Sequence, residues 1–269
     1  MTEKKSNSWE DPHDRASKRK GIMGIFETIM RRFRLVSFTA LLAPLVFIYI
    51  FCLSVAILPG AYFSLLVYEY FEHQALILPY VAILISLCIA VTVFGFLITL
   101  LLVVPLCNLP FLFMLRSLRA TWYSLSVIPW YYHNALVQLV RFTVLDLVTP
   151  TPLTQMYYRM MGMKIGKNTM INTSNISDPG LITIGDNVTI GGSATVFAHY
   201  GMKGFLIIGH TVIGNNVTIG LKASVMGNVI IGDGVTVAPH NVILPKTRLF
   251  KDVTGLHREK RKDIKDGES

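Results

Sequence analysis

The chain has 269 residues, a formal net charge of +9 and 52% hydrophobic residues, whereas only 15% of its residues are charged. An average soluble domain has about 25% charged residues, so this composition argues against an ordinary soluble protein and favours a membrane protein with a soluble part. The three cysteines, Cys52, Cys88 and Cys107, all lie in apolar stretches without metal-ligand spacing, which argues against a disulfide framework and a cysteine metal site.

Residues 1–34 are predicted to form a basic cytosolic tail that ends in an amphipathic helix. Residues 1–20 are polar and mixed in charge, which is typical of disorder. Residues 22–34 repeat bulky apolar residues at helical spacing and end in three arginines, as expected for a short helix on a membrane surface; a solvated basic leader is the alternative. The apolar run that follows is too long for a cleavable signal peptide. The apolar face comprises Met23, Phe26, Met30 and Phe33.

Residues 35–120 are predicted to form a transmembrane helical hairpin with a broken or re-entrant segment. About 20 apolar residues suffice to span a bilayer, and both halves of this region contain longer runs without any charge. We place the first span near residues 36–58 and the second near residues 76–104, after which a short segment dips back into the membrane or lies within it. The expected helix breakers are Pro59-Gly60 after the first span and Pro105 and Pro110 after the second.

The distribution of lysine and arginine predicts the orientation of this hairpin. Nine of these residues precede the first span, none lies in residues 59–74, and Arg116 and Arg119 follow the second span. The positive-inside rule then places both termini in the cytosol and the connecting loop outside. We therefore expect a multi-pass protein of the cytoplasmic membrane whose C-terminal domain is cytosolic.

Residues 121–162 are predicted to form interfacial helices and a cap for the domain that follows. Aromatic side chains cluster at the start of this region, and such clusters favour the headgroup level of a membrane. The next residues are nearly all apolar, so a third span is the alternative, although it would place the C-terminal domain outside. Residues 151–162 are expected to be a helix that covers the open end of that domain. The aromatic residues are Trp122, Tyr123, Trp130, Tyr131 and Tyr132.

Residues 163–249 carry an internal repeat of six residues. An aliphatic residue returns at every sixth position, and a small or β-branched residue often lies four positions after it. Six residues make one short strand and a corner, and three such sides close a coil of about 18 residues, so that equivalent aliphatic side chains stack. The pattern predicts a parallel β-helix; an antiparallel meander is the alternative, but it has no reason to keep one residue type at one phase. The unbroken ladder comprises Ile213, Ile219, Val225, Ile231, Val237 and Ile243.

The six-residue phase breaks twice within the repeat. Ile171 and Ile184 are 13 residues apart, and Val196 and Ile213 are 17 residues apart. Loops leave a solenoid where its period breaks, and such loops often carry function. The second break, which contains residues 199–204, is therefore the candidate functional loop.

Residues 250–269 are predicted to form a charged C-terminal tail. Basic residues alternate with aspartate and glutamate there, and a helical and a disordered tail remain equally open. A basic tail near an anionic leaflet would add attraction to the membrane surface.

The repeat resembles the hexapeptide-repeat (left-handed parallel β-helix) acyltransferase superfamily. The repeat and the segment before it are similar to the membrane-linked C-terminal domain of ε-poly-lysine synthetases over about residues 151–249. The segment before the repeat contributes Thr151-Pro152-Leu153 and the run from Tyr158 to Gly166. The resemblance implies a left-handed coil and a homotrimer with active sites between subunits. It also implies an acyl-CoA as the donor substrate and no tightly bound cofactor.

The resemblance further implies that one histidine is the general base, which takes a proton from the acceptor as the acceptor attacks the thioester of acyl-CoA. His199 is the first candidate because it opens the second phase break. His210 is the alternate candidate, and His240 is expected to be structural or exposed. A zinc-dependent relative, the γ-class carbonic anhydrase, needs two histidines five residues apart; here the spacings are 11 and 30, so no metal site is expected.

The same resemblance implies that the pantetheine arm of coenzyme A lies in the groove between neighbouring solenoids, against small side chains. Gly220, Ala223 and Ala238 are the matching small positions. Basic residues close to them are candidates for the phosphates of the coenzyme. These are Lys222, Lys246 and Arg248.

Together, these expectations describe a membrane-anchored acyltransferase of the O- or N-acetyltransferase kind. It would move an acyl group from acyl-CoA to a hydroxyl or amine of a membrane-associated acceptor, such as a lipid-linked saccharide. The acceptor is placed at the membrane because a soluble one gives no reason to retain the membrane-bound part. The alternative is a non-catalytic trimeric scaffold or a partner subunit of an envelope-polymer or peptide-forming complex. Membrane lipids are the other expected partners, and nucleic acid is not one.

Overall fold

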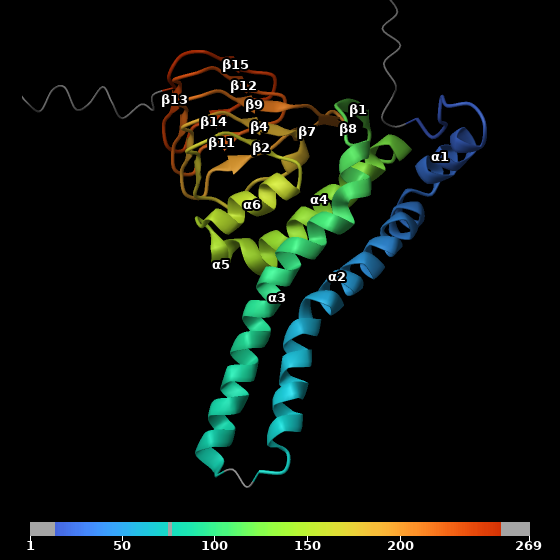
Figure 1. Ribbon diagram of the computed structural model, residues 1–269. Helices are drawn as coiled ribbons and strands as arrows, with labels where there is room; N and C mark the ends of the chain where they lie inside the picture. Colours follow the sequence, from blue (N-terminus) through green and yellow to red (C-terminus); the bar gives the residue numbers. More distant parts are fainter. Residues whose placement is uncertain (1–13, 75–76, 254–269) are drawn as a thin grey trace, which may run out of the picture.

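Two long helices lie side by side and lead to a stack of short strands (Figure 1). In this computed structural model, which describes residues 14–74 and 77–253, helix α2 covers Arg34–Phe71 and helix α3 covers Leu78–Met114. At 1.5 Å per residue, the 38 residues of α2 reach about 57 Å, whereas the hydrocarbon core of a bilayer is about 30 Å thick. By length and composition both helices could cross a membrane, and no other helix in the described ranges could.

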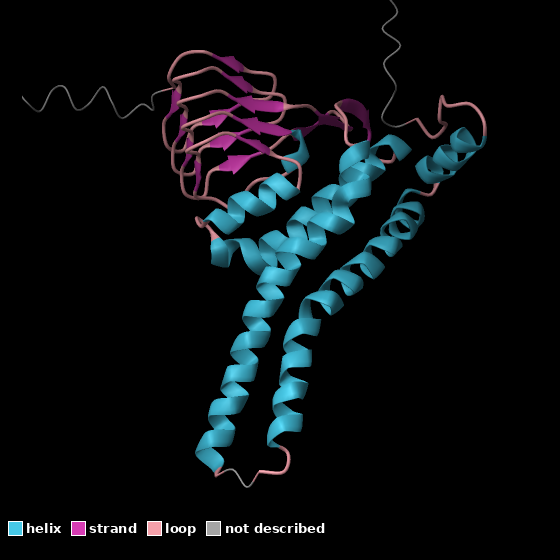
Figure 2. Cartoon of the chain, in the orientation of Figure 1, coloured by secondary structure: helices cyan, strands magenta, loops and turns pink. Residues whose placement is uncertain are grey.

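The prediction that prolines end or break these helices is wrong. Pro59 lies inside α2, which bends along its length and continues (Figure 2), and Pro105 and Pro110 lie inside α3. In apolar helices, neighbouring helices and side chains satisfy the backbone groups that a proline leaves unpaired, so a proline does not have to end the helix. Gly60 instead allows close packing, because a Cβ atom there would lie 2.4 Å from the Cα atom of Thr92 on α3.

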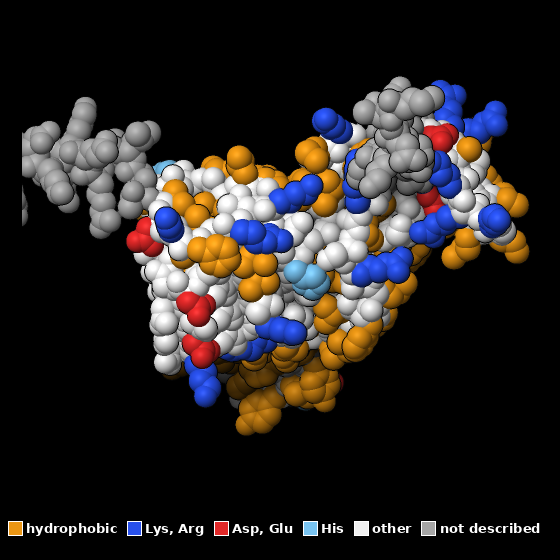
Figure 3. Space-filling view, turned by 90° about the horizontal axis from the view of Figure 1, so that it is seen from above, with side chains coloured by type: hydrophobic (Ala, Val, Ile, Leu, Met, Phe, Trp, Pro, Cys, Tyr) orange, Lys and Arg blue, Asp and Glu red, His pale blue; other side chains and the backbone are white. Residues whose placement is uncertain are grey.

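Helix α1, Ile22–Arg32, confirms the short helix predicted before the first span. It buries an ion pair between Glu27 and Arg31, whose N and O atoms lie 2.6 Å apart. Basic side chains gather over this end of the molecule (Figure 3). A helix with an exposed apolar face next to the start of a long apolar helix fits a membrane surface, and this location stays a prediction. The exposed apolar residues are Ile22, Met23, Ile25, Phe26 and Ile29.

Between the long helices and the repeat, the chain forms one strand and a series of shorter helices. The strand was not expected from the sequence. Helix α6 lies against the first strand of the stack, and α4 lies beside α3 (Figure 1). These elements are β1 (Leu118–Thr121), the 3-10 turn η1 (Leu125–Val127), α4 (Ile128–Val140), the π-helical turn η2 (Arg141–Leu145), α5 (Asp146–Val148) and α6 (Pro152–Met160).

The repeat winds into stacked coils whose strands run parallel in three sheets. The strand orders are β15-β12-β9-β4-β2, β13-β10-β5-β3 and β14-β11-β6. The register places Ile213 between Ile184 and Ile231, so equivalent aliphatic residues stack as predicted and the antiparallel meander is excluded. The left-handed sense of the coil stays a prediction. The strands in these sheets are β2 (Lys164–Ile165), β3 (Met170–Ile171), β4 (Ile182–Ile184), β5 (Thr189–Ile190), β6 (Thr195–Val196), β9 (Thr211–Ile213), β10 (Thr218–Ile219), β11 (Ser224–Val225), β12 (Ile230–Ile231), β13 (Thr236–Val237), β14 (Val242–Ile243) and β15 (Arg248–Leu249).

The second phase break forms a β-hairpin, whereas a loop was predicted. Strands β7 (His199–Met202) and β8 (Phe205–Ile208) pair antiparallel, and β1 adds a third strand on the other side of β8. All four side chains of β8 are buried, so this strand needs a neighbour on each edge and cover on its faces. The hairpin therefore links the solenoid to the segment that follows α3.

Candidate functional site

The two phase breaks meet at one corner of the solenoid. Asp178 belongs to the first break, directly before the 3-10 turn η3 (Pro179–Leu181), and His199 opens the second. The Nδ1 atom of His199 lies 2.5 Å from the Oδ2 atom of Asp178. The carboxylate is completely buried, whereas 21% of the histidine side chain remains accessible. The pair therefore presents a histidine near the surface with an acid behind it.

Asp178 is held by donors from separate parts of the chain. Its Oδ1 atom accepts a hydrogen bond from the indole Nε1 of Trp130 at 2.7 Å. Its Oδ2 atom accepts one from the backbone N–H of Ala198 at 3.0 Å, in addition to that from His199. A buried carboxylate is tolerated only when its oxygens are bonded in this way. The backbone of Asp178 has a φ of 62°, in the left-handed region that aspartate adopts more readily than most residues.

The hydrogen bond to Asp178 determines which nitrogen of His199 can accept a proton. An ionised carboxylate only accepts, so Nδ1 carries the hydrogen and Nε2 keeps its lone pair. The rings of Trp130 and Phe197 contact the imidazole edge to face, with centroids 4.8 Å and 5.5 Å away. Gly227 on the next coil makes room for this arrangement, because a Cβ atom there would lie 2.6 Å from the backbone nitrogen of His199. This is the tautomer that a general base requires.

The other two histidines of the repeat lie elsewhere. His210 is exposed in the segment between β8 and β9, as expected for a solvent-facing turn. His240 is exposed at a corner with a φ of 62°, and its backbone N–H bonds to the carbonyl of Leu221. Of the three histidines, His199 is the one that the structure pairs with a buried carboxylate.

The predicted coenzyme residues fall on two different corners of the solenoid. Gly220 and Ala238 stack on neighbouring coils, since a Cβ atom on Gly220 would lie 2.7 Å from the carbonyl carbon of Ala238. Lys222 and Ala223 belong to the same corner, where the backbone N–H of Ala223 bonds to the carbonyl of Gly220. Lys222 is exposed and Ala223 is buried.

Lys246 lies on the corner that carries His199. Strand pairing aligns Ile230 with Arg248, so Lys246 stacks over Asn228, which follows the Gly227 that covers His199. The guanidinium of Arg248 donates to the carbonyl of Asn228 at 2.9 Å. The structure thus places Lys246 on the corner that carries His199, with Arg248 on β15 bonded to that corner, and leaves the other four predicted residues, Gly220, Lys222, Ala223 and Ala238, at a second corner.

Sequence reasoning missed both Asp178 and Trp130. A signal for Asp178 was present, because it is an acidic residue within the first phase break, and function was sought only in the second. Trp130 was assigned to the membrane interface as one of a group of aromatic residues. Its hydrogen bond to Asp178 joins residues 48 positions apart, and no local pattern predicts such a contact.

The helices before the repeat run along the segment that contains Asp178. Gln138 on α4 donates to Ser177 at 3.4 Å, Arg141 bonds to Asn175, and Asp146 accepts from Ser174. With the bond from Trp130, these contacts follow the chain from residue 178 back to residue 174. The first phase break is therefore shaped by α4, η2 and α5 and not by the coil alone.

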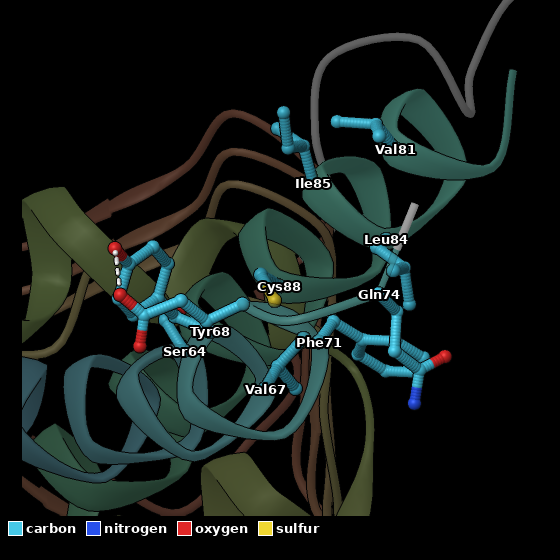
Figure 4. Close-up of a pocket in the computed structure, with 10 residues that line it drawn as sticks. Ser64, Val67, Tyr68, Phe71, Gln74, Val81, Leu84, Ile85 and Cys88 are labelled. Atoms are coloured by element: carbon cyan, nitrogen blue, oxygen red, sulfur yellow. Dashed lines mark hydrogen bonds between the residues drawn. The ribbon is translucent and has the colours of Figure 1, made fainter. Parts of the chain in front are cut away.

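Two cavities in the described part of the chain are lined by neither His199 nor Asp178. One of about 390 Å³ lies between the far ends of α2 and α3, where the Tyr68 hydroxyl donates to Glu72 at 3.1 Å (Figure 4). Another, of about 300 Å³, lies between the start of α2 and three aromatic residues, Trp122 and Tyr123 before α4 and Tyr131 on α4. The first is at the end of the hairpin remote from the solenoid (Figure 1), so it takes no part in the chemistry of His199.

Two family models match the repeat. A model described as bacterial transferase hexapeptide (six repeats) covers residues 210–245, and one described as hexapeptide repeat of succinyl-transferase covers residues 181–202. Over 132 residues, the chain is 29% identical to the Bacillus subtilis protein YvoF, whose name describes it as a candidate acetyltransferase; the match covers 46% of this chain and 74% of that protein. Residues 203–209, within the second phase break, lie in neither family model.

Solved structures with likeness to the chain include acetyltransferases. A hexapeptide-repeat acetyltransferase of Vibrio cholerae in complex with acetyl coenzyme A is 21% identical, with a TM-score of 0.37 over 49% of this chain and 85% of that chain. A maltose O-acetyltransferase of Clostridium difficile is 19% identical, with a TM-score of 0.37 over 53% and 90%. A serine acetyltransferase of Neisseria gonorrhoeae is 20% identical, with a TM-score of 0.30. The match covers 49% of this chain and only 55% of the serine acetyltransferase chain.

These TM-scores are all below 0.5. The family models and the sequence relative agree with the stacked parallel strands. Together they support a place for this chain in the hexapeptide-repeat acetyltransferase superfamily.

Proposed function

We propose that this chain is a membrane-anchored, acyl-CoA-dependent acyltransferase in which His199 is the general base. The observation that carries the proposal is the pairing of His199 with the buried Asp178 at a corner of a hexapeptide-repeat solenoid. The family models and the relative described as a candidate acetyltransferase support the acyl-CoA-dependent transfer. A non-catalytic scaffold would have no use for a buried carboxylate that orients an accessible histidine.

The proposed reaction uses the free Nε2 atom of His199. Nε2 takes the proton from an acceptor hydroxyl or amine as the acceptor oxygen or nitrogen attacks the thioester carbonyl of acyl-CoA. The imidazolium that forms is stabilised by the carboxylate of Asp178. When the tetrahedral intermediate collapses, the carbon–sulfur bond breaks and the imidazolium returns the proton to the departing sulfur. The products are the acylated acceptor and free coenzyme A, and His199 ends in its starting state.

The residues proposed for coenzyme binding lie in two groups, one at each of two corners of the solenoid. Lys246 lies on the corner that carries His199 and Arg248 bonds to that corner, which supports a role for both charges in binding coenzyme phosphates near the reacting thioester. Gly220, Lys222, Ala223 and Ala238 would contact the coenzyme from a second corner. Both sets are used if the groove lies between two solenoids, as a homotrimer provides.

Exposed apolar side chains on the solenoid support the proposal of a homotrimer. Leu221, Val242 and Leu244 are exposed on the later coils, and a neighbouring solenoid would cover them. Native mass spectrometry in detergent is expected to show three copies. A protein that is only monomeric would contradict this assembly.

The proposed acceptor is associated with the membrane, and a lipid-linked saccharide is an example. Support comes from the placement of the dyad, because Asp178 bonds to α4 and α4 packs beside the long apolar helix α3. We also propose that both termini and the solenoid are on the cytosolic side, where acyl-CoA is found.

The proposal is tested by incubating the purified protein in detergent with acetyl-CoA and a membrane lipid extract. We expect mass spectrometry to detect a lipid whose mass has increased by one acetyl group, together with release of free coenzyme A. The control omits the protein. Release of coenzyme A without an acetylated lipid would contradict the membrane-associated acceptor, and no consumption of acetyl-CoA would contradict acetyl transfer.

A further inference from the structure

We infer that Trp130, on helix α4 outside the solenoid, is a positioning residue of the transfer site. Its indole holds the carboxylate of Asp178, and the carboxylate in turn orients His199. This inference rests on the proposed function, because it assigns Trp130 a part in the same site. It gives α4 a role in the chemistry beyond that of a tether.

The contacts of Asp178 show why the indole matters. The carboxylate uses Oδ2 for His199 and for the backbone of Ala198, and uses Oδ1 for Trp130. Loss of the indole N–H would leave Oδ1 buried without that donor, and the carboxylate could then rotate about its Cβ–Cγ bond away from His199. The same ring also contacts the imidazole directly, with centroids 4.8 Å apart and planes at 66°.

Helix α4 is itself fixed to the two long helices. The Nδ1 atom of His133 on α4 lies 2.9 Å from the amide oxygen of Asn108 on α3. The hydroxyl of Tyr132 donates to the carbonyl of Leu41 on α2 at 2.6 Å, and that of Tyr49 on α2 donates to the carbonyl of Ala135 at 2.7 Å. The position of Trp130 therefore depends on the packing of α4 against α2 and α3. The hydrogen bond that holds Oδ1 of Asp178 is therefore present only when the solenoid is joined to this helical part.

A purely structural role for Trp130 is the competing explanation, because its side chain is also part of the buried core. The two explanations differ in what a phenylalanine would do. Phenylalanine keeps an aromatic ring in the core but has no N–H, so a structural role predicts little change in turnover. A positioning role predicts loss of turnover with acetyl-CoA binding intact.

The test is a double-mutant cycle on the full-length protein in detergent, with Trp130→Phe, Asp178→Ala and both changes together. The rate of coenzyme A release from acetyl-CoA is measured with the membrane lipid extract as the acceptor probe. We expect Trp130→Phe to lower kcat by about 10- to 100-fold, the range for a hydrogen bond to a charged group, and to leave KM for acetyl-CoA within about 2-fold. In the Asp178→Ala background, Trp130→Phe should have almost no further effect, because the group through which it acts is gone.

Two further variants distinguish a loss of folding from a loss of the hydrogen bond that positions Asp178. Trp122→Phe makes the same substitution at a half-buried tryptophan that has no bond to Asp178, and it is expected to keep the parent rate. Trp130→His retains an N–H donor on an aromatic ring and should keep more of kcat than Trp130→Phe. Melting temperature in detergent is recorded for each protein.

The outcomes distinguish this inference from the proposed function. Equal losses in Trp130→Phe and Trp130→His, additive losses in the double mutant, or a parent rate in Trp130→Phe would overturn the positioning role while leaving His199 and Asp178 in place. A parent rate in Asp178→Ala would instead overturn the proposed site itself.

Discussion

At the scale of single residues, Asp178 combines a buried charge, a left-handed backbone and a hydrogen bond to the histidine next to it. The charge is what the proposed mechanism uses, because it stabilises the imidazolium that forms during transfer. The volume and the acceptor oxygen at Oδ1 serve the structure. A substitution that keeps the volume and an acceptor oxygen but removes the charge separates the catalytic role from the structural one.

We expect Asp178→Asn to lower the rate of acetyl transfer by roughly 10²–10⁴-fold while the protein stays folded. The amide has the size of the carboxylate but cannot stabilise a positive imidazole, and its NH₂ group can force the wrong tautomer on His199. The rate of coenzyme A release and the melting temperature in detergent are the measurements. A large fall in melting temperature with an unchanged rate would show that the carboxylate is structural.

Residue-level prediction from the sequence was uneven for a physical reason. His199 could be chosen as a candidate because a break in a strict period is visible in the chain. Asp178 could have been found in the same way, since it lies in the other break. Trp130 could not, because its contact with Asp178 depends on where the packing of α4 places a distant segment of the chain.

At the scale of elements, periodic segments were predicted well and proline-containing segments were not. The parallel strands followed from the ladder of stacked aliphatic residues, since one position per six must enter the interior of every coil. The predicted ends of α2 and α3 were wrong because proline was expected to break these helices, as it does in helices that are exposed to water. The hairpin β7–β8 was missed because β8 is covered partly by β1, which lies far from it in the sequence.

The close approach of α2 and α3 at Gly60 gives a stability prediction. Gly60→Ala places a methyl group 2.4 Å from the Cα atom of Thr92, so the helices must separate or shift. We expect a loss of about 1–3 kcal/mol in the free energy of unfolding, the range for overpacking. Thermal unfolding in detergent measures it.

Gly95→Ala is the matched control for this change. A Cβ atom on Gly95 would come no closer than 4.0 Å to the backbone nitrogen of Gly60, so there is room for the methyl group. Alanine also favours a helix more than glycine does. Equal losses of stability in the two variants would mean that the helices are not in contact at Gly60.

The contact between α3 and α4 predicts a dependence of stability on pH. Burial lowers the pKa of His133 to about 4 from its ordinary value near 6.5, and the charge of Asp178 opposes this only in part. Between pH 6.5 and pH 4 the unfolded chain therefore binds this proton more readily than the folded protein, so folded stability falls as the pH is lowered. The full contribution is on the order of 3 kcal/mol.

His133→Gln tests this dependence, because an amide can still bond to Asn108 but does not titrate. Between pH 7 and pH 5, the melting temperature of the parent should fall more steeply than that of His133→Gln. Parallel curves for the two proteins would show that His133 is protonated without difficulty in the folded state and hence is not buried as described.

At the scale of the whole molecule, the proposed chemistry requires the solenoid and the supply of acyl-CoA on the same side of the membrane. By length and composition the two long helices could take the chain across a membrane and back, and the distribution of lysine and arginine predicts a cytosolic solenoid. Length and hydrophobicity could be read from the sequence directly. Orientation depends on charges that lie partly outside the described residues.

Labelling of single cysteines in intact cells tests this topology. In a background lacking Cys52, Cys88 and Cys107, Glu69→Cys should react with an impermeant thiol reagent and Lys251→Cys should not. Both positions are exposed in the structure, so a difference in reaction reports the side of the membrane and not burial. The reverse pattern would place the solenoid outside the cytosol and would contradict acyl-CoA as the donor.

The central claim is that His199 is the base of an acyl transfer, and the most direct measurement is the rate of transfer from acetyl-CoA to the membrane lipid extract in His199→Ala and His210→Ala. Both histidines belong to the same phase break, but only His199 of the two bonds to Asp178 in the structure. We expect His199→Ala to reduce the rate by roughly 10²–10⁴-fold and His210→Ala to keep it, with both proteins folded. An inactive His210→Ala beside an active His199→Ala would contradict the account.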